Sequence, residues 1–336
     1  MLGSPALHDP LLEIQDLQTE IPTRGRIVRP ARGLDLSLRH GECLGVAGES
    51  GCGKTMLLLA IMRLLPPGAT ISAGSILFEG QDLVNLPEAK MRAIRGRRIS
   101  MVFQEPTTAL NPVFTIGSQL TESIRLHDSV NRKVAEARAA ELLSDMRIPD
   151  PTRRLRQYPH ELSGGMRQRV MLAIAIASRP SVVLADEPTS SLDVTVQAEI
   201  IALLAGLRAR YGLSLIFVSH DLALLSQLCD RIAVMYLGRV VEAGTASEII
   251  DSPLHPYTRA LLACVPTLPG RDNHRVGTSP TSFQEIPGEL PDGAITIPGC
   301  QFHPRCQSAL PRCRDDSPTL KSTTQTHQVA CFIAAG

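Results

Sequence analysis

Short apolar runs alternate with longer helical patterns through most of the chain. The runs lie at residues 43–47, 98–103, 182–185 and 213–218, and a stretch with helical apolar spacing follows each of them. Uninterrupted apolar runs are typical of parallel strands buried on both faces. The pattern therefore predicts an α/β fold with a parallel sheet, in which ligand-binding residues lie at the carboxyl ends of the strands.

Other patterns flank this alternation. Residues 12–17 and 34–38 alternate between apolar and polar positions and predict a small antiparallel sheet, with the Arg- and Pro-bearing stretch 22–33 separating its strands. Residues 116–146 predict a helical insert. Beyond about residue 265 the composition shifts to Pro, Gly and Thr with little periodicity, so we expect an appended segment with a thin core.

Residues 48–55 fit the pattern G-x-x-x-x-G-K-[ST] between a buried strand and an apolar helix. Backbone N–H groups at a helix N-terminus favour phosphate, Lys54 offers a charge to the β- and γ-phosphates, and Thr55 can hold Mg²⁺. A glycine-rich turn that binds nothing is the alternative. The predicted nucleotide-binding residues here are Gly48, Glu49, Ser50, Gly51, Cys52, Gly53, Lys54 and Thr55.

Polar residues also follow the later strands. Phosphoryl transfer needs a phosphate cradle, a metal and an oriented water. Asp186 is placed to help hold Mg²⁺, and Glu187 to polarise the attacking water. Gln104 is a candidate for coordinating Mg²⁺ or water, and His220 for hydrogen-bonding the γ-phosphate. In isolation such residues are ordinary caps and loop residues; it is their order after the phosphate-binding loop that singles them out.

Taken together, these motifs make the chain resemble an ATP-binding-cassette (ABC) ATPase from about residue 11 to 265. This implies a P-loop fold with a RecA-like parallel core, an N-terminal antiparallel subdomain, a helical subdomain at about 105–165, and ATP and Mg²⁺ as cofactors. In this family two cassettes face head to tail, so Ser163, Gly164 and Gly165 would bind the partner's nucleotide. The resemblance rests on Gly48–Thr55, Gln104, Leu162-Ser163-Gly164-Gly165-Met166, Leu184-Ala185-Asp186-Glu187, Ser191-Leu192-Asp193 and His220.

Further segments resemble the oligopeptide/dipeptide importer ATPases, at residues 104–112, 162–169, 193–197, 255–262, 286–291 and 299–306. Met166 resembles the first of the two ATPases that such importers usually carry. The resemblance implies a translocating ATPase on the cytoplasmic face of the inner membrane. Its partners would be a second ATPase in a heterodimer, two permeases and a periplasmic or extracellular solute-binding protein. Nickel, opines or another small solute are alternatives to peptides.

Four cysteines cluster in residues 266–336, with five, six and seventeen residues between them: Cys300, Cys306, Cys313 and Cys331. Four thiolates suit Zn²⁺ or an iron–sulfur cluster, and spacing alone does not choose. The resemblance favours a 4Fe-4S cluster with a structural or regulatory role, and four reduced thiols are the third possibility. No predicted nucleotide-binding residue lies in this extension, so we expect nucleotide binding largely to survive the loss of one cysteine.

The charge and composition of the chain limit which classes of partner it can have. The chain has 34 Lys and Arg against 33 Asp and Glu, so no basic surplus argues for nucleic acid. It has no N-terminal signal pattern and no apolar run of spanning length, which predicts a cytoplasmic protein.

No aromatic residue precedes Phe78. The family usually stacks an aromatic side chain on adenine, so Arg26, Arg29 or Ile27 would have to take that place here.

Two rival functions remain. One is a soluble cassette protein of DNA repair or translation, but such proteins usually carry two cassettes or long coiled-coil insertions. The other is a metal-binding regulatory module with a degenerate ATPase. The intact residues Lys54, Asp186, Glu187 and His220 argue against degeneracy.

Overall fold

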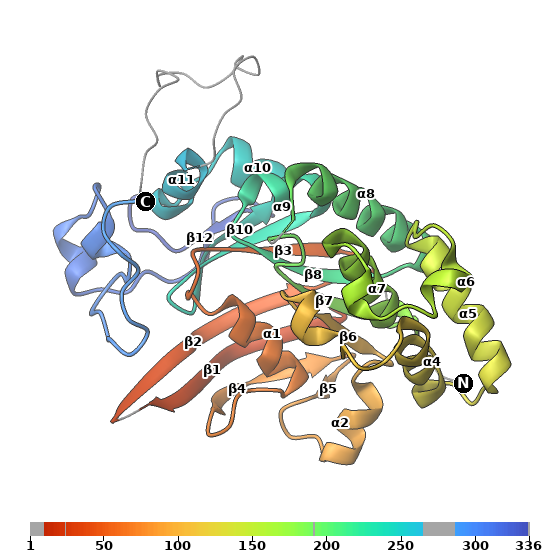
Figure 1. Ribbon diagram of the computed structural model, residues 1–336. Helices are drawn as coiled ribbons and strands as arrows, with labels where there is room; N and C mark the ends of the chain where they lie inside the picture. Colours follow the sequence, from red (N-terminus) through yellow and green to blue (C-terminus); the bar gives the residue numbers. More distant parts are fainter. Residues whose placement is uncertain (1–9, 24, 191, 265–285, 335–336) are drawn as a thin grey trace.

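The computed structural model describes residues 10–23, 25–190, 192–264 and 286–334. Its centre is an eight-stranded sheet in the order β11-β12-β10-β9-β3-β8-β7-β6 (Figure 1). The neighbours from β9 to β6 are parallel, and β10, β12 and β11 add antiparallel strands. These strands are β3 (Cys43–Ala47), β6 (Ile99–Val102), β7 (Val182–Asp186), β8 (Ser214–Ser219), β9 (Arg231–Tyr236), β10 (Arg239–Thr245), β11 (Lys321–Ser322) and β12 (Gln328–Val329).

The parallel strands confirm the predicted α/β fold. Every residue of β3, β7 and β8 is buried, as expected of strands covered on both faces. The carboxyl ends of β3, β6, β7 and β8 lie next to one another because these strands are parallel neighbours. The residues that follow them are therefore brought to one edge of the sheet.

The antiparallel sheet is also present, but its hairpin is longer than predicted. It has the order β2 (Arg26–Leu38), β1 (Leu12–Thr23), β4 (Thr70–Phe78), β5 (Gln81–Asp82). Strands β1 and β2 pair as far as Thr23 opposite Arg26, so most of residues 22–33 is strand and not a separating stretch. Backbone hydrogen bonds hold the two strands together at this exposed end. Because neither face is buried there, apolar and polar side chains do not alternate, and the sequence pattern does not show the strands.

Helices cover the sheet, and the predicted insert lies between β6 and α7. Thr115 and Asn131 cap α4 and α5 with their side chains. Helices α4 to α6 lie at one end of the molecule and the C-terminal residues at the other (Figure 1). The helices are α1 (Lys54–Met62), α2 (Glu88–Ile94), α3 (Pro106–Ala109), α4 (Ile116–His127), α5 (Arg132–Asp145), α6 (Pro151–Arg154), η1 (Pro159–Glu161), α7 (Gly164–Ile176), α8 (Val194–Tyr211), α9 (Leu222–Leu228), α10 (Ala246–Asp251), α11 (Pro256–Ala263), η2 (His303–Arg305) and η3 (Pro311–Arg314).

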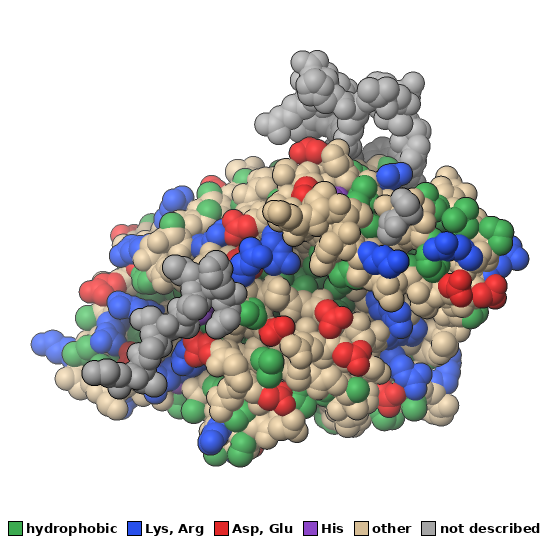
Figure 2. Space-filling view, turned by 180° about the vertical axis from the view of Figure 1, so that it is seen from behind, with side chains coloured by type: hydrophobic (Ala, Val, Ile, Leu, Met, Phe, Trp, Pro, Cys, Tyr) green, Lys and Arg blue, Asp and Glu red, His purple; other side chains and the backbone are tan. Residues whose placement is uncertain are grey.

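The C-terminal extension, described over residues 286–334, joins the main sheet. Its strand β12 pairs with β10, with Val329 opposite Glu242. Acidic and basic side chains are interspersed over the face in Figure 2, in keeping with the balanced charge. Among the described residues, none of the helices has the length and apolar character needed to cross a bilayer.

Candidate functional site

The loop at residues 48–55 connects the buried strand β3 to helix α1, as predicted. Gly53 precedes the helix with φ +112°, and a Cβ there would lie 2.2 Å from the carbonyl oxygen of Pro30. A side chain is therefore excluded both by the backbone conformation and by space. The loop is held tightly, because the amide of Gly238 donates to the carbonyl of Cys52 at 2.9 Å.

Lys54 is the charged centre of this loop. Its side chain is 5% exposed, and Nζ donates to the carbonyl oxygens of Gly48 at 2.7 Å and Glu49 at 3.0 Å. Nζ also lies 3.7 Å from Oε1 of Glu187. The ammonium group is thus held between the loop and the end of β7.

Thr55 and Asp186 meet across the site. The Thr55 hydroxyl donates to Oδ1 of Asp186 at 3.1 Å, and this joins the start of α1 to the end of β7. Burial raises the pKa of Asp186, and the hydrogen bond from Thr55 opposes that shift. A hydroxyl and a carboxylate are oxygen ligands of the kind that Mg²⁺ prefers, so the pair fits the predicted magnesium site.

Glu187 and His220 form the next pair. Nδ1 of His220 lies 3.2 Å from Oε2 of Glu187, and the side chains are 56% and 13% exposed. This hydrogen bond, with a smaller contribution from Lys54, lowers the pKa of Glu187, and it raises the pKa of His220. The backbone of Glu187 has φ 42°, a sparsely populated conformation for a residue with a side chain. The carboxylate is therefore held between the Lys54 ammonium group and the His220 ring.

Gln104 follows β6 and reaches the same edge. Its Nε2 donates to the Ser190 hydroxyl at 3.5 Å, and that hydroxyl donates to the carbonyl of Glu187 at 3.1 Å. The structure thus brings Gln104, Thr55, Asp186, Glu187 and His220 together. Ser191, which belongs to a predicted motif, lies outside the described residues.

Ser163, Gly164 and Gly165 are at the start of α7. The Ser163 hydroxyl caps the helix by accepting from the amide of Met166 at 3.3 Å. Ser163 and Gly164 are exposed. In the described part of the chain, none of the three shares a hydrogen bond with residues 48–55.

The cysteines of the extension lie near one another. Burial raises the pKa of the Cys300 thiol to about 11, and the thiols of Cys313, Cys306 and Cys331 contribute to the same shift. However, no group of three or more His, Cys, Asp or Glu side chains among the described residues has an arrangement ready for a metal ion. The donor set suits a metal, but the four cysteines, all of them described, are not arranged as a preformed site.

The residues suggested for adenine have other partners. Arg26 pairs with Asp292 of the extension at 3.2 Å, and Arg29 pairs with Glu20 at 3.0 Å. Ile27 is 42% exposed.

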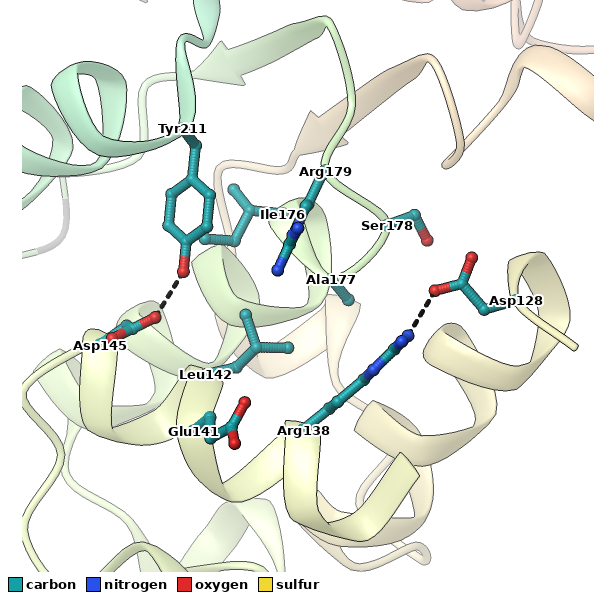
Figure 3. A pocket seen from close by; sticks show the side chains of 10 residues that line it. All are labelled: Asp128, Arg138, Glu141, Leu142, Asp145, Ile176, Ala177, Ser178, Arg179 and Tyr211. Atoms are coloured by element: carbon teal, nitrogen blue, oxygen red, sulfur yellow. Dashed lines mark hydrogen bonds and ion pairs between the residues drawn. The ribbon is translucent and has the colours of Figure 1, made fainter. Parts of the chain in front are cut away.

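A polar cavity of about 300 Å³ lies elsewhere, where α5 faces the ends of α7 and α8 (Figure 3). Tyr211 donates to Asp145, and Arg138 pairs with Asp128 across it. None of the predicted site residues lines this cavity.

Two residues that contact the loop have no role in the sequence prediction. The guanidinium of Arg305 is 3.0 Å from both carboxylate oxygens of Glu49, and the Tyr257 hydroxyl accepts from the Glu49 amide at 2.9 Å. Both residues lie in segments of the family resemblance, at 255–262 and 299–306, but no local pattern connects either of them with Glu49, which is 256 positions from Arg305.

Two family models match the chain. The ABC transporter model matches residues 31–190, and the model of the oligopeptide/dipeptide transporter C-terminal region matches residues 241–313.

Individual proteins are similar over almost the whole chain. The dipeptide transport ATP-binding protein of Bacillus subtilis is 41% identical, over 96% of this chain and 94% of that protein. The oligopeptide transport ATP-binding protein of the same organism is 42% identical, over 96% of this chain and 88% of that protein. A dimeric ATP-binding cassette in a post-hydrolysis state with ADP and Pi superposes with a TM-score of 0.63 and 25% identity, covering 70% of this chain and 98% of that one.

Proposed function

The chain belongs to the ATP-binding subunits of ABC transporters, and on that premise we propose that it hydrolyses ATP to drive the import of peptides. The hydrogen bond between Thr55 and Asp186 carries the proposal, because it joins the phosphate-binding loop to the strand end that supplies Glu187. In this reading residues 11–265 are the ATPase domain, with a helical subdomain at about 105–165, and residues 266–336 are an extension.

Each residue at the edge of the sheet has a role in hydrolysis. The loop amides and Lys54 would bind the phosphates, and Thr55 and Asp186 would hold Mg²⁺, which supplies positive charge to neutralise that of the phosphates. Glu187 orients the attacking water, and its lowered pKa keeps it ionised. His220 holds Glu187 and would hydrogen-bond the γ-phosphate, and Gln104, just after β6, would coordinate Mg²⁺ or water.

The partners follow from the exposed start of α7. Ser163 and Gly164 have free surface at a helix N-terminus, which favours a phosphate group of another molecule. The similar cassette that was solved with ADP and Pi is a dimer. We infer a cassette dimer held at the cytoplasmic face of the membrane by permease subunits, with a second, different ATPase and a solute-binding protein as the remaining components.

A transport assay tests this function. A strain that lacks the gene and needs one amino acid should fail to grow when that amino acid is supplied as a peptide. Wild-type protein should restore growth and Lys54→Ala should not. Supply of the free amino acid is the control, because it bypasses the importer. Unimpaired growth of the deletion strain on every peptide tested would exclude peptide import.

We further propose that the four cysteines of the extension bind a 4Fe-4S cluster, with Zn²⁺ as the alternative. The thiols interact electrostatically and belong to a segment with little regular structure, so binding would draw them into place and supply ordering free energy. The cluster would have a structural or regulatory role, since ATP hydrolysis includes no redox step.

Metal analysis tests the cluster. Anaerobically purified protein should be brown, with about four iron and four sulfide per chain, and Cys306→Ser should lose both. If the protein contained about one zinc per chain and no iron, the cluster assignment would be wrong and the cysteines would form a zinc site. Free alkylation of all four thiols in the native protein would exclude both.

A further inference from the structure

Arg305 carries a buried positive charge from the C-terminal extension to the phosphate-binding loop. The residue is 8% exposed, and its Nη1 lies 3.0 Å from each carboxylate oxygen of Glu49. Its Nε and Nη2 donate to the carbonyl oxygens of Pro287 at 2.8 Å and Gly288 at 3.0 Å. All three nitrogens are thereby used, and the guanidinium is fixed in one orientation.

Glu49 links Arg305 to other residues of the phosphate-binding loop. Its side chain binds Arg305, its amide donates to the Tyr257 hydroxyl at 2.9 Å, and its carbonyl accepts from Lys54 Nζ at 3.0 Å. The peptide groups around Glu49 therefore connect the extension with the lysine that faces the phosphates. A displacement of Glu49 would move an acceptor of Lys54.

Apolar contacts support the same junction. The ring of Phe302, from the extension, lies 5.2 Å from that of Tyr236 and 5.3 Å from that of Tyr257. Phe302 is 3% exposed. Leu290 of the extension lies over the loop, since a Cβ at Gly51 would be 3.6 Å from its Cδ2. The extension thus contacts the loop at Gly51 through Leu290, and through Phe302 it packs against Tyr257, which binds the Glu49 amide.

We propose that Arg305 is a positioning residue of the nucleotide site, which holds the phosphate-binding loop in its binding conformation through Glu49. A loop that is ordered before binding loses less conformational entropy when phosphate arrives, so affinity is higher. The inference rests on the proposed ATPase function and adds the extension to the nucleotide site. It adds a residue of the extension to a site for which the sequence predicts no residue there, and it leaves the expectation for the cysteines unchanged.

The experiment measures the affinity for ATP in purified full-length protein by calorimetry, together with kcat and KM in the assembled transporter. Arg305→Gln should raise the Kd roughly tenfold, the size expected for one lost charged hydrogen-bond pair. KM should rise with it, and kcat should stay near the wild-type value. Hydrogen exchange at residues 48–55 should become faster, which a role confined to the extension would not cause.

Three variants make the result specific. Glu49→Gln should weaken binding as Arg305→Gln does, and the double variant should be no worse than either single one, because both remove the same contact. Arg312→Gln is the matched control: Arg312 is an exposed arginine of the extension whose side chain lies over the Phe332 ring, and its loss should leave the Kd unchanged.

An unchanged Kd in a folded Arg305→Gln protein would overturn the inference, and so would full additivity of the two single variants. If Arg305→Gln does not fold, Glu49→Gln alone decides, because an unchanged Kd there has the same consequence. Wild-type protein that binds no ATP would instead refute the proposed function.

Discussion

The nucleotide-binding core and the C-terminal extension are held together in different ways. In the core, strands β3, β7 and β8 are buried at every position, and many apolar side chains share the packing. The extension has two-residue strands and 3₁₀ helices, and fewer buried side chains attach it, among them Phe302, Arg305, His327 and Val329. A region with distributed contacts tolerates single substitutions, whereas a region with few contacts depends on each of them.

The largest expected effect is on ATP hydrolysis, and it should leave the packing of both the core and the extension unchanged. Glu187→Gln should lower ATP hydrolysis at least roughly a hundredfold, because general-base catalysis contributes about that much or more. ATP binding and the unfolding temperature should change little, since the amide keeps the shape of the side chain. Steady-state ATPase assays of the assembled transporter, with Glu136→Gln on the exposed face of α5 as the control, measure this. Hydrolysis at the wild-type rate would remove Glu187 from the mechanism.

The next effect tests the attachment of the extension. Nε2 of His327 lies 2.8 Å from Oε1 of Glu242, which is fully buried on β10. His327→Ala leaves this carboxylate with one partner fewer and should destabilise the attachment by about 2 kcal/mol.

Hydrogen exchange locates that loss. Amides in residues 286–334 should exchange faster in His327→Ala, and those of β8 should exchange as in the wild type. Gln328→Ala, at the neighbouring half-buried position, is the control. Equally faster exchange in both regions would mean that the extension and the core unfold as one unit, and that the extension is not attached separately.

The smallest effect concerns the pair in the core. The hydrogen bond to Glu187 raises the pKa of His220 above 6.5 and lowers that of Glu187 below 4.5. The stabilisation from His220 is therefore complete below pH 6.5 and is lost as pH rises through the raised value. The stabilisation from Glu187 is present above pH 4.5 and is lost as pH falls through the lowered value.

NMR titration checks this pair directly. In metal-free protein the His220 ring should titrate above 6.5, and in Glu187→Gln its midpoint should return toward 6.5. An unchanged midpoint would show that Glu187 does not hold the ring.

Sequence reasoning succeeded where the information is local. The loop at residues 48–55 is defined by adjacent residues, and Asp186 and His220 follow apolar runs whose parallel arrangement fixes where they meet. Strand β3 (Cys43–Ala47) was predicted with the observed boundaries. In each case a short stretch contains both the structural signal and the chemical group.

It failed where a contact joins distant residues. Glu49 belongs to the predicted loop and Arg305 to a segment of the family resemblance, but no local pattern links the two, and only the folded chain brings them within 3.0 Å. The strands β11 and β12 are too short for a period to appear in the sequence. The predicted hairpin between β1 and β2 was shorter than the observed one, because its tip is defined by backbone pairing and not by alternating side chains.

The pairing of β12 with β10 has a consequence for solubility. An edge strand exposes unpaired N–H and C=O groups to which another chain can add, and short strands with charged residues prevent this. Here β12 covers β10, and β11, which is two residues long and begins with Lys321, forms the outer border. A chain truncated before β11 would leave β10 open to intermolecular pairing at Glu242 and Ala243, so β11 and β12 also protect the protein from aggregation.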